Sequence, residues 1–595
     1  MMKRFLRSRF ARQESVHDYI GILVPLEEAH LHSHSARCGK AEFEDRRGSD
    51  DGNANLDGDE DEETALGTSY KNSDNEGEGM LQMDAAEYTI EGLRRDVRKG
   101  EPGPRWTEYE LKSKLINKAI QDIGMGRYNW QLFILCGFGW FADNLWMQGV
   151  SLTLPSLSEE FGITEKHVRY TTSSLYLGLS IGSALWGLGA DIMGRRIAFN
   201  LTLLITSIFG TLAAYAPNWP SVCILFGLMG TGVGGNLPVD GALFLEFLPD
   251  ASSSLLTLLS VWWPVGQLVS SLFAWYFITN WPVDQGWRLF IATIGLVTFI
   301  MFIIRFGLFH LFESPKYLLS QGRQSEAVAV VHGIAYRNNK KTWLTEEVLD
   351  AVVDTDDTER APARVSARSV LTQNLSSFSL SHIQPLFQNR KLGLTTALIW
   401  FCWASIGMGY PLFNAFLPQY LSHGGGEVSA RESSAPTFAT PAETYRNYAI
   451  ISIAGVPGSL LAAYLVDHKS PFLGRKGTLA ISTFVSAVFL YLFVTLGTTP
   501  TAQLFFTSVE AFCQNIMYGV LYAFTPEIFP APVRGAATGV ASFLNRVTGL
   551  LAPLLAANIP GDGSTTPIYL SAALILAAFV GMVLIPIETR GRQRL

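Results

Sequence analysis

Apolar stretches of about 20 to 28 residues recur from Trp130 almost to the end of the chain, and they decide what it can fold into. Each is long enough to cross a hydrocarbon layer of about 30 Å as a helix. Twelve such stretches are present, at 130–155, 170–190, 197–216, 221–247, 254–278, 288–312, 392–421, 447–466, 477–496, 503–525, 535–558 and 565–587. The sequence therefore predicts an all-α membrane protein with twelve transmembrane helices in two six-helix halves.

The composition agrees with a membrane protein and argues against a soluble enzyme. Only 16% of the residues are charged, against about a quarter in globular proteins. The formal net charge of −7 arises from residues 42–79, which hold 14 acidic and 3 basic side chains. This segment has too few large apolar side chains to form a core, so we expect it to be disordered. Because the acidity belongs to one segment, it indicates neither a basic nor an acidic partner, and no nucleic-acid partner is expected.

The apolar stretches and polar connections divide the chain into five regions. We expect a polar N-terminal region, a six-helix bundle, a central loop, a second six-helix bundle and a short tail. Their boundaries are 1–126, 127–312, 313–391, 392–587 and 588–595.

The distribution of Lys and Arg predicts the orientation in the membrane. If both termini are cytosolic, the cytosolic flanks and loops hold 28 of these residues, and the opposite side holds five. Cytosolic loops carry an excess of positive charge. We therefore expect both termini in the cytosol.

The two halves repeat one another at matching places. GADIMGRR at 189–196 corresponds to LVDHKSPFLGRK at 465–476, and EFLP at 246–249 corresponds to EIFP at 527–530. Duplicated halves of this kind rock against each other around a central site.

The loop motifs carry a family resemblance. Asp191-x-x-Gly194-Arg195-Arg196, Glu527-x-x-Pro530-x-x-x-Arg534, ESPKYLL at 313–319 and PIETRGR at 586–592 resemble the major facilitator superfamily over about residues 125–595. The resemblance implies that the cytosolic loops form charge locks that control opening. The residues it assigns to this conformational gate are Asp191, Gly194, Arg195, Arg196, Glu246, Gly474, Arg475, Lys476, Glu527 and Arg534. Ser253 stands where the second half has Arg534, so Glu246 lacks its local partner and would pair elsewhere, for example with Arg195 or Arg196.

Within this superfamily, the sequence is most similar to the synaptic-vesicle-type and nicotinate-type organic-ion permeases. YAFTPEIFPAPVRGAATG at 522–539, GVGGNLPV at 232–239 and GWFAD at 139–143 carry this similarity. Sugar porters are the neighbouring branch. Phe226 replaces their fourth-helix arginine and the seventh span lacks their paired glutamines, while Gln267 is the one sugar-like residue.

Ionisable side chains inside the spans are few, and each needs a partner or a function. Asp143 lies about 20 Å into the first span at 1.5 Å per residue, and we expect it to carry a coupling proton, with a hydrogen-bonded structural role as the alternative. Asp240, near Glu246 on the fourth span, is the second candidate for proton coupling. Arg546 either pairs with Asp143 or binds an anionic solute. Arg305 lies near the end of the sixth span, where snorkelling is a sufficient explanation.

Uncharged polar side chains on several spans are candidates for a hydrophilic substrate cavity. With Arg546, the predicted set is Asn144, Gln148, Asn236, Gln267, Asn414 and Asn545.

The resulting hypothesis is a proton-coupled symporter that moves a small polar organic solute, such as an organic acid or a nicotinate-like compound, by alternating access. The alternatives are a sugar transporter, a drug/proton antiporter and a non-transporting receptor on the same scaffold. No catalytic or nucleotide-binding motif, metal site or cofactor is indicated, so an enzyme is not expected. We expect a monomer in a lipid bilayer, with the plasma membrane as its location and a vacuolar or other internal membrane as the alternative.

The predicted orientation is tested by labelling single cysteines introduced at Ser433 and Ser376. An impermeant thiol reagent applied to intact cells should label the cysteine at position 433 alone. Labelling at position 376 on intact cells would contradict the orientation.

Overall fold

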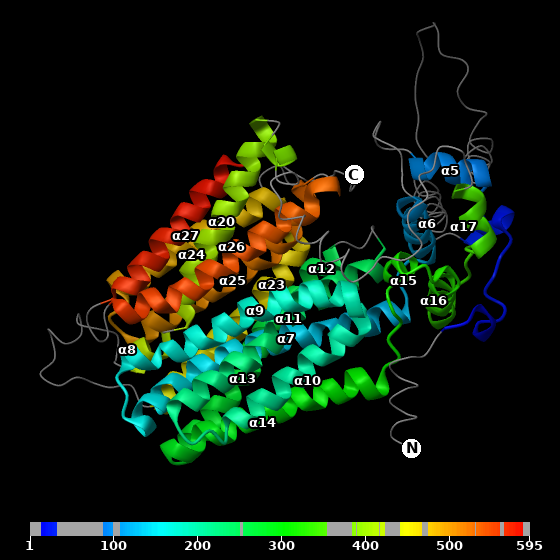
Figure 1. The fold of residues 1–595 in the computed structure, drawn as a ribbon. Coiled ribbons are helices and arrows are strands. Elements are labelled where there is room, and N and C mark those ends of the chain that lie inside the picture. Colours follow the sequence, from blue (N-terminus) through cyan, green and yellow to red (C-terminus); the bar gives the residue numbers. More distant parts are fainter. Residues whose placement is uncertain are drawn as a thin grey trace, which may run out of the picture. The chain divides into compact units, whose positions relative to one another are not determined.

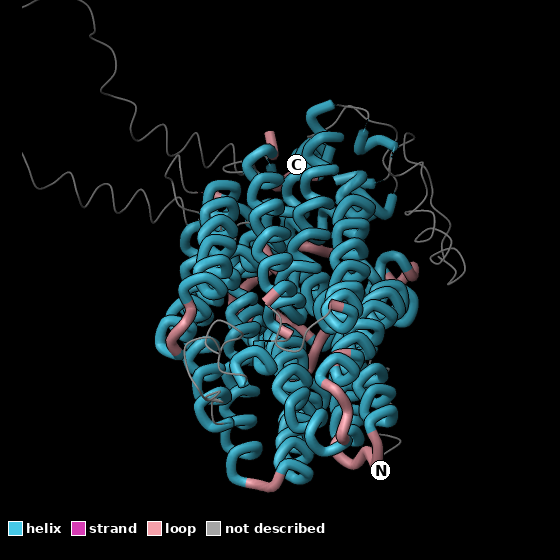
Figure 2. Tube along the Cα trace, turned by 90° about the vertical axis from the view of Figure 1, so that its left-hand side faces the viewer, coloured by secondary structure: helices cyan, strands magenta, loops and turns pink. Residues whose placement is uncertain are grey.

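A computed structural model describes eleven segments of the chain. They are residues 14–32, 87–98, 108–249, 254–353, 384–387, 390–415, 417–422, 441–466, 474–529, 531–559 and 565–586. The acidic segment 42–79, residues 423–440 and the tail 588–595 lie outside them. Figures 1 and 2 show that the described residues are almost entirely helical.

Twelve long helices confirm the predicted fold class. Their bounds are α7 (Arg127–Phe161), α9 (Tyr170–Met193), α10 (Arg195–Ala213), α11 (Trp219–Phe247), α13 (Trp262–Asn280), α14 (Val283–Ile303), α20 (Arg390–Asn414), α23 (Pro441–Val466), α24 (Arg475–Leu496), α25 (Pro500–Ile528), α26 (Ala531–Asn558) and α27 (Thr566–Leu584). Nine of the described helices are long and apolar enough on their own to cross a membrane. The other three are α7, α9 and α25, and α7 and α25 carry the polar side chains described below.

The chain forms two compact units, and both six-helix halves belong to the same one. This larger unit consists of residues 132–245, 253–311 and 366–595. Within it, α13 packs on α23 and α9 packs on α26, so each pair joins the two halves. The short helix α8 (Glu165–Val168) lies at one end of this unit, and α12 (Ser254–Leu258) lies at the other (Figure 1). We call these the α8 end and the α12 end.

Glycine makes the same turn in each half, at the α12 end. Gly194 separates α9 from α10 with φ +99°, and Gly474 precedes α24 with φ +137°. Residues with a Cβ rarely adopt such φ values. The two GR motifs therefore share a backbone role as well as a sequence.

The smaller unit is built from the N-terminal region and the central loop. It contains α5 (Ile90–Arg98), α6 (Glu108–Ile123), α15 (Pro315–Ser320), α16 (Gln324–Arg337) and α17 (Glu346–Val353). Arg94 donates to the carbonyl of Ala351 at 2.7 Å, and Tyr88 and Trp343 both donate to the carboxylate of Asp122 at 2.8 Å. These bonds join the two regions into one folded body.

Residues 14–32 also belong to this body, which the sequence did not predict. The amide of Val24 donates to the carbonyl of Thr342 at 3.1 Å, and the amide of Thr342 donates to the carbonyl of Ile22 at 3.0 Å. The side chains of Ile22 and Val24 are buried. The polar N-terminal region therefore includes a folded segment, because residues 14–32 make backbone hydrogen bonds to Thr342 and bury apolar side chains.

Two deletions separate these parts of the N-terminal region. Removal of residues 42–79 should leave the thermal unfolding midpoint of the purified protein unchanged. Removal of residues 1–32 exposes the apolar surface under Ile22 and Val24, so α16 and the loop around Thr342 should exchange backbone hydrogens faster. Equal exchange of α16 in the two deletion variants would contradict the assignment.

A buried histidine in the smaller unit predicts a pH dependence. His332 on α16 is fully buried, and its Nε2 donates to the carbonyl of Leu344 at 2.7 Å, while no described group bonds its Nδ1. Burial lowers the pKa of His332 below its ordinary 6.5. The unfolded chain therefore binds more protons below pH 6.5, and stability present above that pH is lost as the pH falls towards the lowered pKa, by at most about 1.4 kcal/mol per pH unit.

This loss is measured by hydrogen exchange of α16, corrected for the intrinsic rate, at about pH 7.5 and about pH 5.5. Protection should fall at the lower pH in the wild type and change less in His332→Gln. An equal loss in both proteins would rule out His332 as the cause.

Candidate functional site

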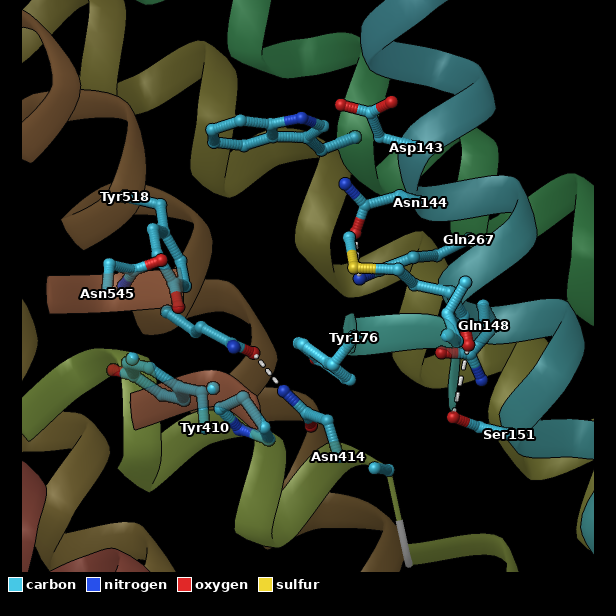
Figure 3. Close-up of a pocket in the computed structure, with 18 of the residues that line it drawn as sticks. Asp143, Asn144, Gln148, Ser151, Tyr176, Gln267, Tyr410, Asn414, Tyr518 and Asn545 are labelled. Carbon is cyan, nitrogen blue, oxygen red and sulfur yellow. Dashed lines mark hydrogen bonds between the residues drawn. The ribbon is translucent and has the colours of Figure 1, made fainter. Parts of the chain in front are cut away.

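A cavity of about 160 Å³ lies between the two halves. Figure 3 shows Asp143, Asn144 and Gln148 entering it from α7, opposite Tyr410 and Asn414 from α20. Of the cavity residues predicted from the sequence, the structure places at its wall Asn144, Gln148, Gln267, Asn414, Asn545 and Arg546.

Asp143 accepts a hydrogen bond from α11, the fourth span. The Nδ2 of Asn236 on α11 donates to Oδ1 of Asp143 at 3.0 Å, and both residues are buried. Asn236 therefore lies in the layer behind Asp143 and does not line the cavity. Arg546 on α26 lines the cavity and interacts electrostatically with Asp143. The two opposite charges therefore belong to different halves.

Amide side chains are fixed in pairs within each half. Nε2 of Gln267 donates to Oδ1 of Asn144 at 3.0 Å, and Nδ2 of Asn414 donates to Oε1 of Gln514 at 3.1 Å. Each pair leaves donor and acceptor positions that a solute can use. The buried Nε2 of Gln148 has no hydrogen-bond partner among the described residues. Gln148 is therefore an available donor at the cavity wall.

Aromatic side chains form much of the remaining wall, and sequence reasoning did not single out the tyrosines. The aromatic residues that line the cavity are Tyr176, Trp263, Tyr410, Tyr518 and Tyr522. The rings of Trp263 and Tyr522 meet edge to face across the two halves, with centroids 5.2 Å apart. Membrane tryptophan and tyrosine are commonest at the lipid interface, so composition gives no signal for rings that face a cavity.

Asp240 and Arg305 form an ion pair outside the cavity, and this corrects the expectation that Arg305 snorkels. Nη2 of Arg305 lies 2.6 Å from Oδ2 of Asp240, and both side chains are 0% exposed. Arg305 therefore does not snorkel. Its Nε and Nη1 donate to the carbonyls of Leu135 and Phe199, each at 2.9 Å. Asp240 thus has a countercharge within the first half, and its role in proton coupling stays a prediction.

Gly139 provides the space for this ion pair. A Cβ at position 139 would lie 1.8 Å from Oδ2 of Asp240 and 3.0 Å from Nη2 of Arg305. The glycine of GWFAD thus lets the carboxylate approach α7. Asp143 is four residues further along α7, and Asn236 is four residues before Asp240 on α11. The ion pair and the Asn236 bond to Asp143 are therefore consecutive contacts between the same two helices.

Two buried hydrogen bonds join the halves near the α8 end. Nη1 of Arg169, at the start of α9, donates to the carbonyl of Ala556 on α26 at 2.8 Å. The hydroxyl of Tyr445 on α23 donates to the carbonyl of Leu152 on α7 at 3.0 Å. Both bonds join one half to the other, so opening this end requires both to break.

The gate residues implied by the family resemblance are described in part. Arg475 at the start of α24 forms an ion pair with Glu527 near the end of α25, and Nζ of Lys476 donates to the carbonyl of Ile585 at 2.5 Å. These contacts lie within the second half. The side chains of Asp191 and Arg534 lie outside the described residues, and Glu246 is half-buried at the end of α11.

The helices, the repeated turns and the cavity between halves are those of a known transporter fold. The profile of the Major Facilitator Superfamily matches residues 132–472 and 439–595. The chain belongs to the major facilitator superfamily. It is accordingly a multi-pass membrane transporter and not an enzyme, as predicted from its spans and loops.

Three similar proteins place the chain within this superfamily. "MFS siderochrome iron transporter 1" of Ceriporiopsis subvermispora is 41% identical, over 87% of this chain and 99% of that protein. "Synaptic vesicle 2-related protein" of Bos taurus is 27% identical, over 87% of this chain and 88% of that protein. The proton:xylose symporter XylE of E. coli has a similar fold, with a TM-score of 0.57 and 17% identity over 78% of this chain and 98% of that chain. The likeness to the synaptic-vesicle branch is confirmed.

Charge removal tests the Asp240–Arg305 pair. Arg305→Gln or Asp240→Asn leaves one charge buried without its partner, at a cost of about 3–5 kcal/mol. The double variant removes both charges and should recover much of the lost thermal stability of the purified protein. If the losses of the two single variants simply add in the double variant, the two side chains are not coupled.

A glycine substitution tests the same contact from α7. Gly139→Ala should destabilise the protein because its methyl group displaces the carboxylate of Asp240. Gly187→Ala on α9 is the matched control, since a Cβ there would meet nothing within 4 Å. Similar unfolding midpoints for the two variants would contradict the close packing.

Proposed function

We propose that this transporter couples the movement of a small polar organic solute to protons by alternating access, with Asp143 as the proton carrier. The observation that carries the proposal is the placement of Asp143 and Arg546 from opposite halves at one cavity. Because the two charges lie on different halves, their interaction energy differs between the empty and the filled cavity. Protonation of Asp143 removes its charge and changes that balance.

Arg546 is proposed to bind an anionic group of the solute. Guanidinium binds a carboxylate through two parallel hydrogen bonds. The amide pairs supply further donors and acceptors, and the aromatic wall suits a flat ring. These features favour an organic acid or a nicotinate-like compound.

The cavity volume supports a small solute. An engineered cavity of roughly 150 Å³ in another protein binds benzene, and the cavity here is about 160 Å³. One six-membered ring with a carboxyl group therefore suits its size better than a siderochrome does. The relatives' names range from siderochrome iron to xylose, so no single substrate transfers to this chain.

A sugar transporter is the second candidate. Gln267 at the cavity wall and the fold of the proton:xylose symporter support it. Asp143 and Arg546 favour a charged solute over a neutral one. A drug/proton antiporter would use the same cavity in the opposite direction.

The proposals for oligomeric state, orientation and membrane are those made from the sequence. We propose a monomer in a bilayer, with both termini in the cytosol and the plasma membrane as its location. In this orientation the α8 end is external, and the hydrogen bonds of Arg169 and Tyr445 close the external side.

Substitution of Asp143 tests the coupling. Asp143→Asn resembles the protonated acid but cannot release a proton, so a pH gradient should no longer drive accumulation of labelled nicotinate in proteoliposomes. Exchange of nicotinate across the membrane should persist, because exchange needs only rocking between loaded states. Glu159→Gln, which removes an exposed acid, is the control. Accumulation by Asp143→Asn at the wild-type level would make Asp143 structural.

Substitution of Arg546 tests the solute contact separately. Arg546→Lys retains the charge and loses the planar pair of donors, so the KM for nicotinate should rise by roughly tenfold, equivalent to about 1.4 kcal/mol. An unchanged KM would show that Arg546 does not hold the carboxylate of nicotinate through two hydrogen bonds.

A further inference from the structure

Glu510 on α25 is a buried acid that the proposed mechanism does not use. It is 2% exposed, and Ser486 on α24 donates to its Oε1 at 3.4 Å. No cationic side chain pairs with it among the described residues, in contrast to Asp240 with Arg305. An ionised carboxylate without a partner is very costly in a membrane interior, so Glu510 needs a proton or a bound cation.

The groups that surround Glu510 are phenols, a thiol and a hydroxyl. Tyr410 on α20 and Tyr448 on α23 lie close enough to interact electrostatically with it, as do Cys513 and Tyr518 on its own helix. The hydroxyls of Tyr410 and Ser486 lie 3.0 Å apart. A hard metal cation takes six or more oxygen ligands, whereas only Ser486 bonds Glu510 among the described residues. The surroundings therefore favour a proton.

Unpartnered polar atoms lead from Glu510 towards the α8 end. The Oγ1 of Thr444, the Oδ1 of Asn447 and the hydroxyl of Tyr448 are buried and have no hydrogen-bond partner among the described residues. Positions 444, 447 and 448 lie on one face of α23, because residues three and four apart are neighbours on a helix. Buried polar atoms of this kind usually bind protein groups or water. This face therefore offers a polar route along the first turns of α23.

The route starts beside a contact that closes the α8 end. Tyr445, one residue after Thr444, makes the hydrogen bond to Leu152 of the other half. Separation of the halves at this end breaks that bond and exposes the first turn of α23. Access to Glu510 thus depends on the conformation of the transporter.

Glu510 also adjoins the substrate cavity. Gln514 follows it by one helical turn on α25, lines the cavity and accepts from Asn414. Tyr410, whose hydroxyl contacts Ser486, lines the same cavity. A change of charge at Glu510 therefore changes the electrostatic potential at the solute position.

We propose that Glu510 is a second proton-binding site of the transporter, in the half opposite Asp143, reached from the α8 end along the Thr444, Asn447 and Tyr448 face of α23. The inference rests on the proposed proton-coupled function. It gives each half one titrating acid, Asp143 in the first and Glu510 in the second.

Infrared difference spectroscopy of the purified full-length protein between high and low pH tests the site without any solute. The wild type should show carboxylic-acid C=O bands from two buried acids. Glu510→Gln, which keeps the side-chain shape, should lose one band, and Asp143→Asn should lose the other. Glu510→Asp should shift the band and retain it. The exposed-acid control Glu159→Gln should keep both bands.

An unchanged spectrum in both Glu510→Gln and Glu510→Asp would overturn the proposal. Failure of the proposed function gives a different result. If both bands are present but a proton gradient drives no solute uptake, only the solute hypothesis is contradicted. The same spectra recorded in potassium and in sodium should agree. Loss of the Glu510 band on adding sodium would show a metal-cation site in place of a proton site.

The rate at which Glu510 is protonated tests the access route. In proteoliposomes given an external pH step, the combined variant Thr444→Val and Asn447→Leu should slow protonation of Glu510 by tenfold or more when the α8 end faces outward. The Asp143 band, which belongs to the other half, is the internal control. An unchanged rate for Glu510 would contradict the route.

Discussion

The low dielectric of a membrane interior is the constraint on which this structure depends. A charge placed there needs an opposite charge, a proton or contact with a water-filled cavity. Ionisable side chains of the spans meet this requirement in three ways. Arg305 and Asp240 neutralise each other in a fully buried pair. Asp143 faces a cavity that Arg546 also lines. Glu510 has no cationic partner among the described residues and does not line the cavity, so it requires a proton.

These differences separate charges that are paired within one half from charges that face each other across the two halves. The Asp240–Arg305 pair joins α7, α11 and the π-helical turn Ile304–Leu308 that follows α14, all within the first half, so its strength does not change when the halves move apart. Asp143 and Arg546 come from opposite halves, so their interaction does change with that movement. A charge whose energy depends on conformation is able to couple proton binding to opening. A charge pair confined to one half supplies rigidity.

The fold was predictable from the sequence because length and hydropathy constrain a membrane helix strongly. The span expected at 221–247 is observed as α11, Trp219–Phe247, and the span expected at 477–496 is observed as α24, Arg475–Leu496. The turns at Gly194 and Gly474 were recognisable from their motifs. Depth along a helix also indicated that Asp143 lies well inside the membrane.

The pairing of side chains was not predictable, because it depends on the rotation and register of neighbouring helices. The position of Arg305 along its span indicated snorkelling, whereas the structure turns it inward to Asp240. Asn236 has the same polarity as the cavity amides but lies behind Asp143. The tyrosines of the wall were not identified, since the sequence does not show which face of α25 carries Tyr518. The folding of residues 14–32 depends on two backbone hydrogen bonds to Thr342, which is distant in sequence and gave no local signal.

The central claim is that the two halves separate at the α8 end when the transporter works. The most direct measurement is the distance between spin labels at His167 on α8 and Asn558 at the end of α26, two exposed positions on helices that pack together. Pulsed electron resonance on the protein in lipid should show a short and a long distance, with their proportions changing with pH and with nicotinate. A single distance, unchanged by pH and by nicotinate, would contradict the account.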